Sequence, residues 1–262
     1  MERKRISYTI KMTGVVAAFF ILFALPQQVV AQDVDNLKHR FQQLYLRGEM
    51  EPWKKLVDSL RSAKIDEAED DQLLYGEYGL TGYLIGKDEK KLARKELDLF
   101  LKHVDSRLAK QPKNASLWAF KAATVGYAIG LQPYKAIYLG SDNKDAVDKA
   151  IMYHKNEPMP LYEWANSLYF RPAFVGGDKK KAAELFERTL EIFRKTETNH
   201  WMYLNVYAWL GQVYARQGDK EKARELYLQI LAEYPDYAWV KNELLPDLDS
   251  DKKRFRFLEL DF

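Results

Sequence analysis

The sequence of 262 residues contains no cysteine. Disulfides, thiolate nucleophiles and thiolate metal ligands are therefore excluded, and so is the acylated N-terminal cysteine of a bacterial lipoprotein. Histidine is also scarce: the four residues His39, His103, His154 and His200 lie far apart, and none forms a metal-ligand spacing such as HExxH. No GxSxG sequence occurs. The composition therefore predicts no metal, no cofactor and no catalytic residues, and hence a protein that is not an enzyme.

The chain also lacks an apolar run that is long enough to span a bilayer. Its longest, residues 14–25, is GVVAAFFILFAL, and a span needs about 20 apolar residues. The run follows a basic start and precedes Val29-Val30-Ala31, where signal peptidase needs small residues. This pattern predicts a signal peptide over residues 1–31 and a mature chain that begins at Gln32. An uncleaved membrane anchor is the alternative.

An excess of charge of either sign is missing once that segment is removed. Residues 1–31 hold four of the 41 basic residues and one of the 38 acidic ones, so 37 of each remain and the net charge is zero. We therefore expect no nucleic-acid partner. Because secreted animal proteins of this size usually carry disulfides, an exported chain without cysteine fits a bacterial periplasm.

Glycine is sparse but recurs at helical spacing between residues 76 and 86. Gly86-Lys87 resembles the end of a phosphate-binding loop, but Thr81 stands where that loop needs glycine, and Asp88 would repel phosphate. Glycines three apart instead place small residues on one face of a helix. The spacing predicts close helix packing there.

The clearest pattern in the sequence is in the C-terminal half. It reads Tyr207-x2-Leu210-Gly211-x2-Tyr214, Gly218-Asp219, Ala223-x3-Tyr227 and then Pro235. The apolar residues recur at helical spacing and indicate a buried stripe. We expect the small residues Gly211 and Ala223 to let two antiparallel helices touch, Gly218 to form the turn, and Asp219 to cap the second helix.

Self-comparison extends this pattern toward the N-terminus. Residues 177–186 (GDKKKAAELF) repeat residues 218–227 (GDKEKARELY) at an offset of 41. Extra residues over 130–143, between two predicted helices, and Arg171-Pro172, where a helix must stop, make the array uneven. The expected fold is an all-α solenoid of five antiparallel hairpins, at residues 34–62, 71–110, 115–156, 160–196 and 200–233.

This spacing resembles the tetratricopeptide repeat, whose pattern is W-x2-L-G-x2-Y, A-x3-F and a closing proline. The run from Tyr169 to Asp178 is also similar to the T component of TRAP transporters and to the regulator of microtubule dynamics proteins. These patterns together predict a signal peptide (1–31), a helical repeat domain (32–248) and a tail (249–262). Residues 237–245 read as a capping helix closed by Pro246. The tail alternates polar and apolar residues and reads as an extended segment that packs on the protein or docks on a partner.

In tetratricopeptide proteins the first helix of each hairpin lines a concave groove that holds a peptide or a helix. The resemblance therefore implies a groove with several tyrosines, although the same residues could simply pack neighbouring hairpins together. The Lys and Asn set that clamps a C-terminal carboxylate in chaperone-binding relatives is absent. The predicted partner-binding residues are Tyr83, Tyr127, Tyr162, Tyr169, Asn205, Gln212 and Arg216.

Two functions follow from the resemblance. The first is a non-catalytic periplasmic scaffold whose groove holds a protein or peptide partner, with a membrane-associated complex among the candidates. The second is a small-ligand or lipid-handling protein like the transporter component, with an apolar tunnel closed by the 130–143 insertion. An open groove would favour the first, and a pore through the solenoid the second. The sequence fixes neither the partner nor the oligomeric state.

Overall fold

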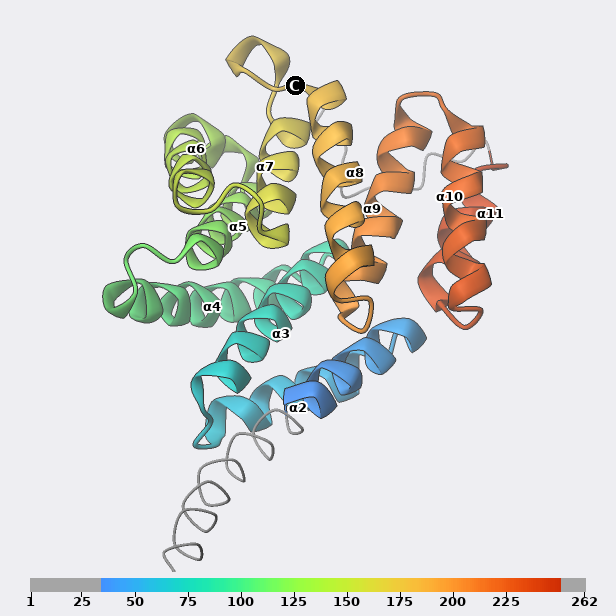
Figure 1. The fold of residues 1–262 in the computed structure, drawn as a ribbon. Helices are drawn as coiled ribbons and strands as arrows, with labels where there is room; N and C mark the ends of the chain where they lie inside the picture. The colour runs from blue at the N-terminus through green and yellow to red at the C-terminus, as the bar shows by residue number, and fades with distance from the viewer. Residues whose placement is uncertain (1–33, 251–262) are drawn as a thin grey trace, which may run out of the picture.

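The computed structural model describes residues 34–250 and is helical throughout, with no strand in that range. The predictions for the signal peptide and for residues 251–262 of the tail fall outside the described residues. Figure 1 shows the helices stacked as successive antiparallel pairs along the chain. The predicted α-solenoid is confirmed.

Five hairpins make up the stack, and they coincide with the five predicted from the sequence. The connections between and within them are two to four residues long, except for the eight residues that follow α7. The helices are residues 34–47 with α2 (Met50–Ser62), α3 (Glu67–Gly86) with α4 (Lys90–Lys110), α5 (Ala115–Leu131) with α6 (Ala136–Tyr153), α7 (Pro158–Phe170) with α8 (Lys179–Thr196), and α9 (Trp201–Arg216) with α10 (Lys220–Glu233).

An acidic or amide side chain caps the start of α3, α5, α8 and α10. Asp219 accepts a hydrogen bond from the backbone N–H of Lys222, as predicted, and Asp178 caps α8 in the same way. Gly218 has φ +90°, a left-handed conformation that glycine adopts without strain. The tight turn of the fifth hairpin therefore follows directly from its Gly-Asp sequence.

The glycine face of α3 packs as the sequence predicts. A Cβ added at Gly76 would lie 2.7 Å from the ring of Phe41, and one at Gly79 would lie 2.8 Å from Trp53. At Gly82 it would meet the hydroxyl of Tyr127 at 2.8 Å. The absence of side chains along this face thus lets α3 approach the first hairpin on one side and α5 on the other.

The close contact at Gly211 has a different partner from the one expected. A Cβ there would lie 2.1 Å from the ring of Tyr227, which covers the glycine, so Tyr227 takes the role that the sequence suggested for Ala223. Ala223 is itself fully buried. The one-turn offset arises because the tyrosine ring is long enough to reach across the gap between α9 and α10.

Both irregular stretches differ from regular repeats, but not in the same way. Only residues 132–135 separate α5 from α6, because α6 begins at Ala136 and absorbs most of the extra residues of 130–143 as two added turns. That stretch is therefore largely helical, a correction to the sequence reading. In the fourth hairpin α7 does stop before Arg171-Pro172, and a 3₁₀ turn, η2 (Ala173–Val175), follows.

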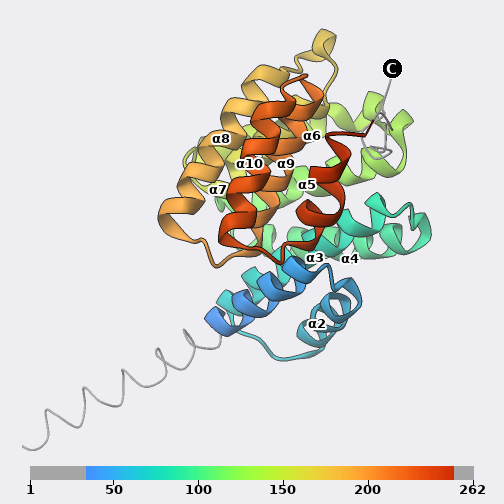
Figure 2. The same cartoon turned by 90° about the vertical axis from the view of Figure 1, so that its right-hand side faces the viewer.

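The solenoid closes on itself. The hairpin of residues 34–62 lies across the lower ends of α8 and α9 in both views (Figures 1 and 2). Lys38 pairs with Glu197 at 2.5 Å, and the hydroxyl of Tyr45 donates to Asn205 Oδ1 at 2.8 Å. The ring of Trp201 lies between these two ends of the chain, 5.2 Å from the ring of Trp53. One hydrophobic core therefore runs through nearly the whole molecule.

A short helical segment closes the C-terminal end, as predicted. It contains a π-helical turn, η3 (Val240–Leu244), and then α11 (Leu245–Asp247). The backbone N–H of Leu245 reaches back five residues to the carbonyl of Val240. Pro246 thus lies inside the segment rather than at its end, because a proline in a first helical turn needs no N–H partner.

Candidate functional site

The predicted groove is occupied by the protein's own core. Four of the seven predicted partner-binding side chains are buried: Tyr162 is 1% exposed, Tyr169 6%, Asn205 6% and Gln212 4%. Such side chains have no surface to offer a partner in this structure. The four positions therefore pack inside the described part of the chain, and partner binding at them stays a prediction.

The other three positions differ from one another. Tyr127 is partly buried, and its hydroxyl donates to the backbone carbonyl of Tyr78 at 3.2 Å. Arg216 is also partly buried and hydrogen-bonds the hydroxyl of Tyr169. Tyr83 alone is well exposed, at 38%, and it lies apart from the rest at the end of α3.

The structure does bring some of the predicted residues together, inside the molecule. Asn205 donates to the hydroxyl of Tyr162 at 2.8 Å and accepts from Tyr45, so it joins α9 to α7 and to the first hairpin. Gln212 donates only to the carbonyl of Ala208 in its own helix, at 3.3 Å. The signal in the sequence was one of packing: tyrosines on the inner face meet each other because the superhelix is tightly wound.

One carboxyl group lies in this aromatic interior. Glu163 on α7 is 5% exposed and accepts hydrogen bonds from the hydroxyl of Tyr78 at 2.9 Å and from Asn166 at 3.0 Å. Burial raises its pKa to about 7, against these two hydrogen bonds, which lower it. No basic side chain pairs with it among residues 34–250. Sequence reasoning gave no sign of this group.

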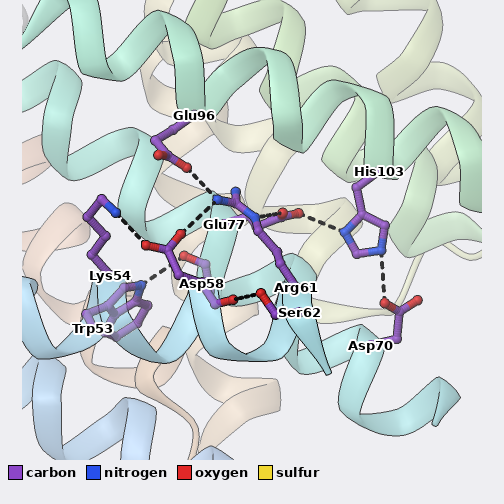
Figure 3. A network of polar contacts seen from close by, with 10 residues as sticks. Trp53, Lys54, Asp58, Arg61, Ser62, Asp70, Glu77, Glu96 and His103 are labelled. Carbon is purple, nitrogen blue, oxygen red and sulfur yellow. Dashed lines mark hydrogen bonds and ion pairs between the residues drawn. The ribbon is translucent and has the colours of Figure 1, made fainter. Parts of the chain in front are cut away.

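A second polar cluster joins the first hairpin to the second. Arg61 of α2 donates to Glu77 of α3 and to Glu96 of α4, both at 2.7 Å, as Figure 3 shows. Both carboxylates are only 2% exposed. Removal of the arginine would leave Glu96 without its partner and Glu77 with His103 alone, so this side chain fixes how α2 sits on the helices beneath it.

His103 of α4 extends the same cluster. Its ring nitrogens lie 2.8 Å from Glu77 and 3.0 Å from Asp70. Burial lowers the pKa of His103, but the hydrogen bonds and charges of Glu77 and Asp70 outweigh it, and the net shift is upward. Glu77, Glu96 and Asp70 each contact a basic side chain of another helix, which is the chemistry of a structural contact. Arg61 Nη2 has no hydrogen-bond partner within residues 34–250.

Apolar surface gathers instead at the edge where the first helix of each hairpin ends. Ser167, near the end of α7, donates to Asn143 of α6 at 2.6 Å, and Asn143 donates to the carbonyl of Ala122 on α5 at 2.8 Å. The middle of α6 therefore lies beside the end of α7. The two irregular stretches, after α5 and after α7, project from this same edge.

These stretches carry the most exposed apolar side chains of the described chain. Ile137 is 84% exposed and Phe174 is 85%, whereas large apolar residues are normally covered. The basic residues Arg171 and Lys179–Lys181 lie next to the second stretch. We name this surface the rim patch, and its residues are Tyr134, Ile137, Tyr138, Phe174 and Val175.

A cavity of about 450 Å³ lies at the opposite edge, near the starts of α3 and α5. Its wall contains charged and amide groups as well as aromatic rings, and no residue of the 130–143 insertion lines it. It is thus not the apolar tunnel that the transporter resemblance implies.

Two searches of residues 34–250 complete the description. In that range no helix has the length and apolarity that crossing a bilayer requires. The same residues contain no group of three or more histidine, aspartate or glutamate side chains placed to hold a metal ion.

Comparison with known families gives one match. Residues 177–235, which include α8, α9 and α10, match the family Tetratricopeptide repeat. No curated protein gives a significant match to the chain. The matched range starts at the Gly-Asp cap of α8 and ends at the proline that closes the fifth hairpin, as the sequence pattern does. Together with the helical architecture, this match supports a tetratricopeptide repeat protein, with the repeat itself shown over residues 177–235.

Proposed function

We propose that this protein is a non-catalytic scaffold that holds a segment of a partner protein on its rim patch. Tetratricopeptide repeats generally mediate protein–protein interaction. The observation that carries the proposal is the exposure of Ile137 and Phe174, both above 80%, on the insertions of two successive hairpins. The groove that usually holds the partner is filled here by Tyr162, Asn205 and their neighbours, which favours an outer surface.

The charge near the rim patch indicates the kind of segment that fits. Arg171 and Lys179–Lys181 add up to four positive charges, against Asp178 and against Glu184, which pairs with Lys181 at 3.2 Å. A partner segment with apolar side chains beside acidic ones would match both features, because complementary charge speeds association and apolar contact slows dissociation. We therefore infer an amphipathic, acidic partner segment.

A photo-crosslinking experiment tests this proposal. A benzophenone amino acid placed at position 174 or 138 should crosslink a partner in the cell, and one placed at Lys195, exposed on the far end of α8, should not. Phe174→Ser combined with Ile137→Ser should abolish the crosslink from position 138. Equal crosslinking from position 195, or capture unaffected by the double variant, would place the partner elsewhere. A crosslink only to a second copy of this chain would also contradict the proposal.

We propose further that the protein works in the periplasm after removal of residues 1–31. The support is the short apolar run at 14–25 followed by Val29-Val30-Ala31. N-terminal sequencing of the exported protein should begin at Gln32. A chain that retains Met1 and sediments with membranes would instead support an anchor.

A small-ligand function is the second candidate, and the observation that favours it is the cavity near the starts of α3 and α5. Its polar wall argues for a polar ligand rather than a lipid. The two functions use opposite edges of the molecule and are compatible.

A further inference from the structure

The cavity is built by segments that are far apart in the sequence. Its wall is formed by the start of α3, the start of α5, the end of α6 and the residues just before α7 and α9. Lys38 of the first hairpin also lines it. A volume of about 450 Å³ is in the range of pockets for small molecules. The lining residues that matter for the argument are Asp71, Gln72, Tyr75, Phe120, Glu157 and Glu197.

One wall is aromatic and ends in a hydroxyl group. The rings of Tyr75 and Phe120 meet edge to face at 5.0 Å. The hydroxyl of Tyr75 makes no hydrogen bond within residues 34–250. Burial raises the pKa of Tyr75, and the carboxylates of Glu197, Asp71 and Glu157 raise it further. Three negative groups therefore act on the same hydroxyl.

Two of these carboxylates already have basic partners. Glu197 pairs with Lys38 at 2.5 Å, and Asp71 pairs with Arg107 at 2.8 Å. Arg107 is shared with other acidic residues of α3. Burial raises the pKa of Asp71, Arg107 lowers it, and the charge of Glu67 raises it; the net shift is upward. The negative charge around Asp71 is thus only partly balanced.

Glu157 is different, because no lysine or arginine pairs with it among the described residues. It accepts a hydrogen bond from the hydroxyl of Ser116 at 2.9 Å and lies 3.7 Å from a ring nitrogen of His154, which is largely exposed. Gln72 adds a second unmatched acceptor: its side chain lines the cavity, is 6% exposed, and its Oε1 has no hydrogen-bond partner within residues 34–250. A buried acceptor without a donor costs free energy, so the wall favours a ligand rich in N–H groups.

An anion fits less well, although α5 begins at this wall. The side-chain oxygen of Asn114 already accepts a hydrogen bond from the backbone N–H of Leu117 at 3.0 Å. This N–H group in the first turn of α5 is therefore not available to an anion. The ammonium of Lys38 is held by Glu197. Of the other basic groups that line the cavity, Lys113 is exposed, and His154 is exposed and lies beside Glu157.

We propose that this cavity binds a small organic cation, an alkylammonium or guanidinium group, which donates to Glu157 and to the Tyr75 hydroxyl while its carbon chain lies against the rings of Tyr75 and Phe120. An aromatic face attracts a cation, and a carboxylate that no lysine or arginine of the described residues neutralises supplies the opposite charge. The cation can come from a free amine or from an arginine side chain of another protein, since both present the same group.

Calorimetric titration of the mature full-length chain tests the proposal, with agmatine as the free cation. We expect agmatine to bind, Glu157→Gln to weaken it by about tenfold or more, and Tyr75→Phe to weaken it while the ring stays in place. Glu184→Gln, on the exposed face of α8, is the matched control and should leave binding unchanged. Thermal melts establish that each variant is folded.

Two further arms decide the outcome. An end-blocked peptide with one arginine identifies the source: tighter binding than agmatine indicates a protein side chain, and weaker binding indicates a free amine, and both support a cation site. Glutarate, a dianion of similar length, should not bind. The proposal is overturned by glutarate binding in place of agmatine, by no agmatine binding up to about 10 mM, or by binding that survives Glu157→Gln. The rim patch variants should not affect this titration, so the two proposals fail separately.

Discussion

The fourth and fifth hairpins carry the same Gly-Asp sequence before their second helix, yet the two glycines do different things. Gly218 adopts φ +90°, and a Cβ there would meet nothing within 4 Å. At Gly177 the left-handed residue is its neighbour Gly176, whereas a Cβ on Gly177 itself would lie 1.8 Å from the carbonyl oxygen of Arg171. In the fourth hairpin the left-handed conformation thus falls one position earlier, at Gly176. Gly177 is needed for a different reason, because a side chain there would collide with the backbone of Arg171.

The comparison extends to the helices. With α7 and α9 aligned at their first residues, the buried Glu163 takes the position of Val206, which is completely buried. Phe186 and Tyr227 occupy the same position in α8 and α10, and both are almost completely buried. The second helices of the two hairpins therefore pack through equivalent aromatic residues. The first helices differ, because the fourth hairpin buries a carboxyl group where the fifth buries a valine.

The largest expected effects come from the shared packing positions. Phe186→Ala and Tyr227→Ala should each lower the free energy of unfolding by about 3–5 kcal/mol, because each removes a large buried ring. Urea denaturation measures both values, with Leu228→Ala, on the exposed face of α10, as a nearly neutral control. If the two variants differed in free energy of unfolding by more than about 2 kcal/mol, Phe186 and Tyr227 would not be equivalent packing positions.

Glu163→Gln should change the stability of the protein in a pH-dependent way, because only the fourth hairpin buries a carboxyl group at this position. The folded-state pKa of Glu163 is about 7 against an ordinary 4.5, so the folded protein keeps the proton longer than the unfolded one. Stability from this group is then complete below about pH 4.5 and is lost as the pH rises through 7. Glutamine still accepts from Tyr78 but carries no charge. The variant should gain up to about 3 kcal/mol over the native protein at pH 8 and little at pH 4.

Thermal melts across this pH range provide the measurement, with Glu184→Gln as the control for an exposed carboxylate. A variant that is less stable than the native protein at every pH would show that the charged form of Glu163 is the one the fold prefers.

The two glycines should respond differently to the same substitutions. Gly177→Ala forces a backbone contact apart and should cost about 1–3 kcal/mol. Gly218→Ala imposes only left-handed strain, about 1 kcal/mol, and Gly218→Asn should cost less because asparagine tolerates that conformation. Denaturation midpoints of the four Ala and Asn variants test this. Relief by asparagine at position 177 would contradict the steric explanation.

The smallest effect on stability is expected at the rim patch. Phe174→Ser removes a side chain that is 85% exposed, so the free energy of unfolding should change by less than about 0.5 kcal/mol. If the insertion of the fourth hairpin exists for binding, the same variant should still lose partner crosslinking. A large fall in stability would mean instead that Phe174 packs on the protein.

Much of the fold was readable from the sequence, because its signals are local. The spacing from Tyr207 to Pro235 predicted a hairpin, and the glycines of α3 predicted a packing face. The site was not readable, since it depends on how far successive hairpins rotate. Tyr162 and Asn205 are 43 positions apart and were assigned to an open face, but the tight winding of the solenoid places them in contact. Nor does any local pattern show that Glu163 is enclosed, or that no lysine or arginine among residues 34–250 pairs with Glu157.

The closure of the first hairpin onto α9 has a consequence for folding. In an extended repeat array each unit contacts only its neighbours, so folding spreads along the chain and either end can fray alone. Here Lys38 and Glu197, 159 positions apart, form a contact, and Tyr45 and Asn205 form another 160 positions apart. These contacts raise the contact order, which slows folding, and they tie the fate of the first hairpin to the last. The molecule therefore behaves less like a row of repeats than like a ring, whose ends must be present together for either to stay folded.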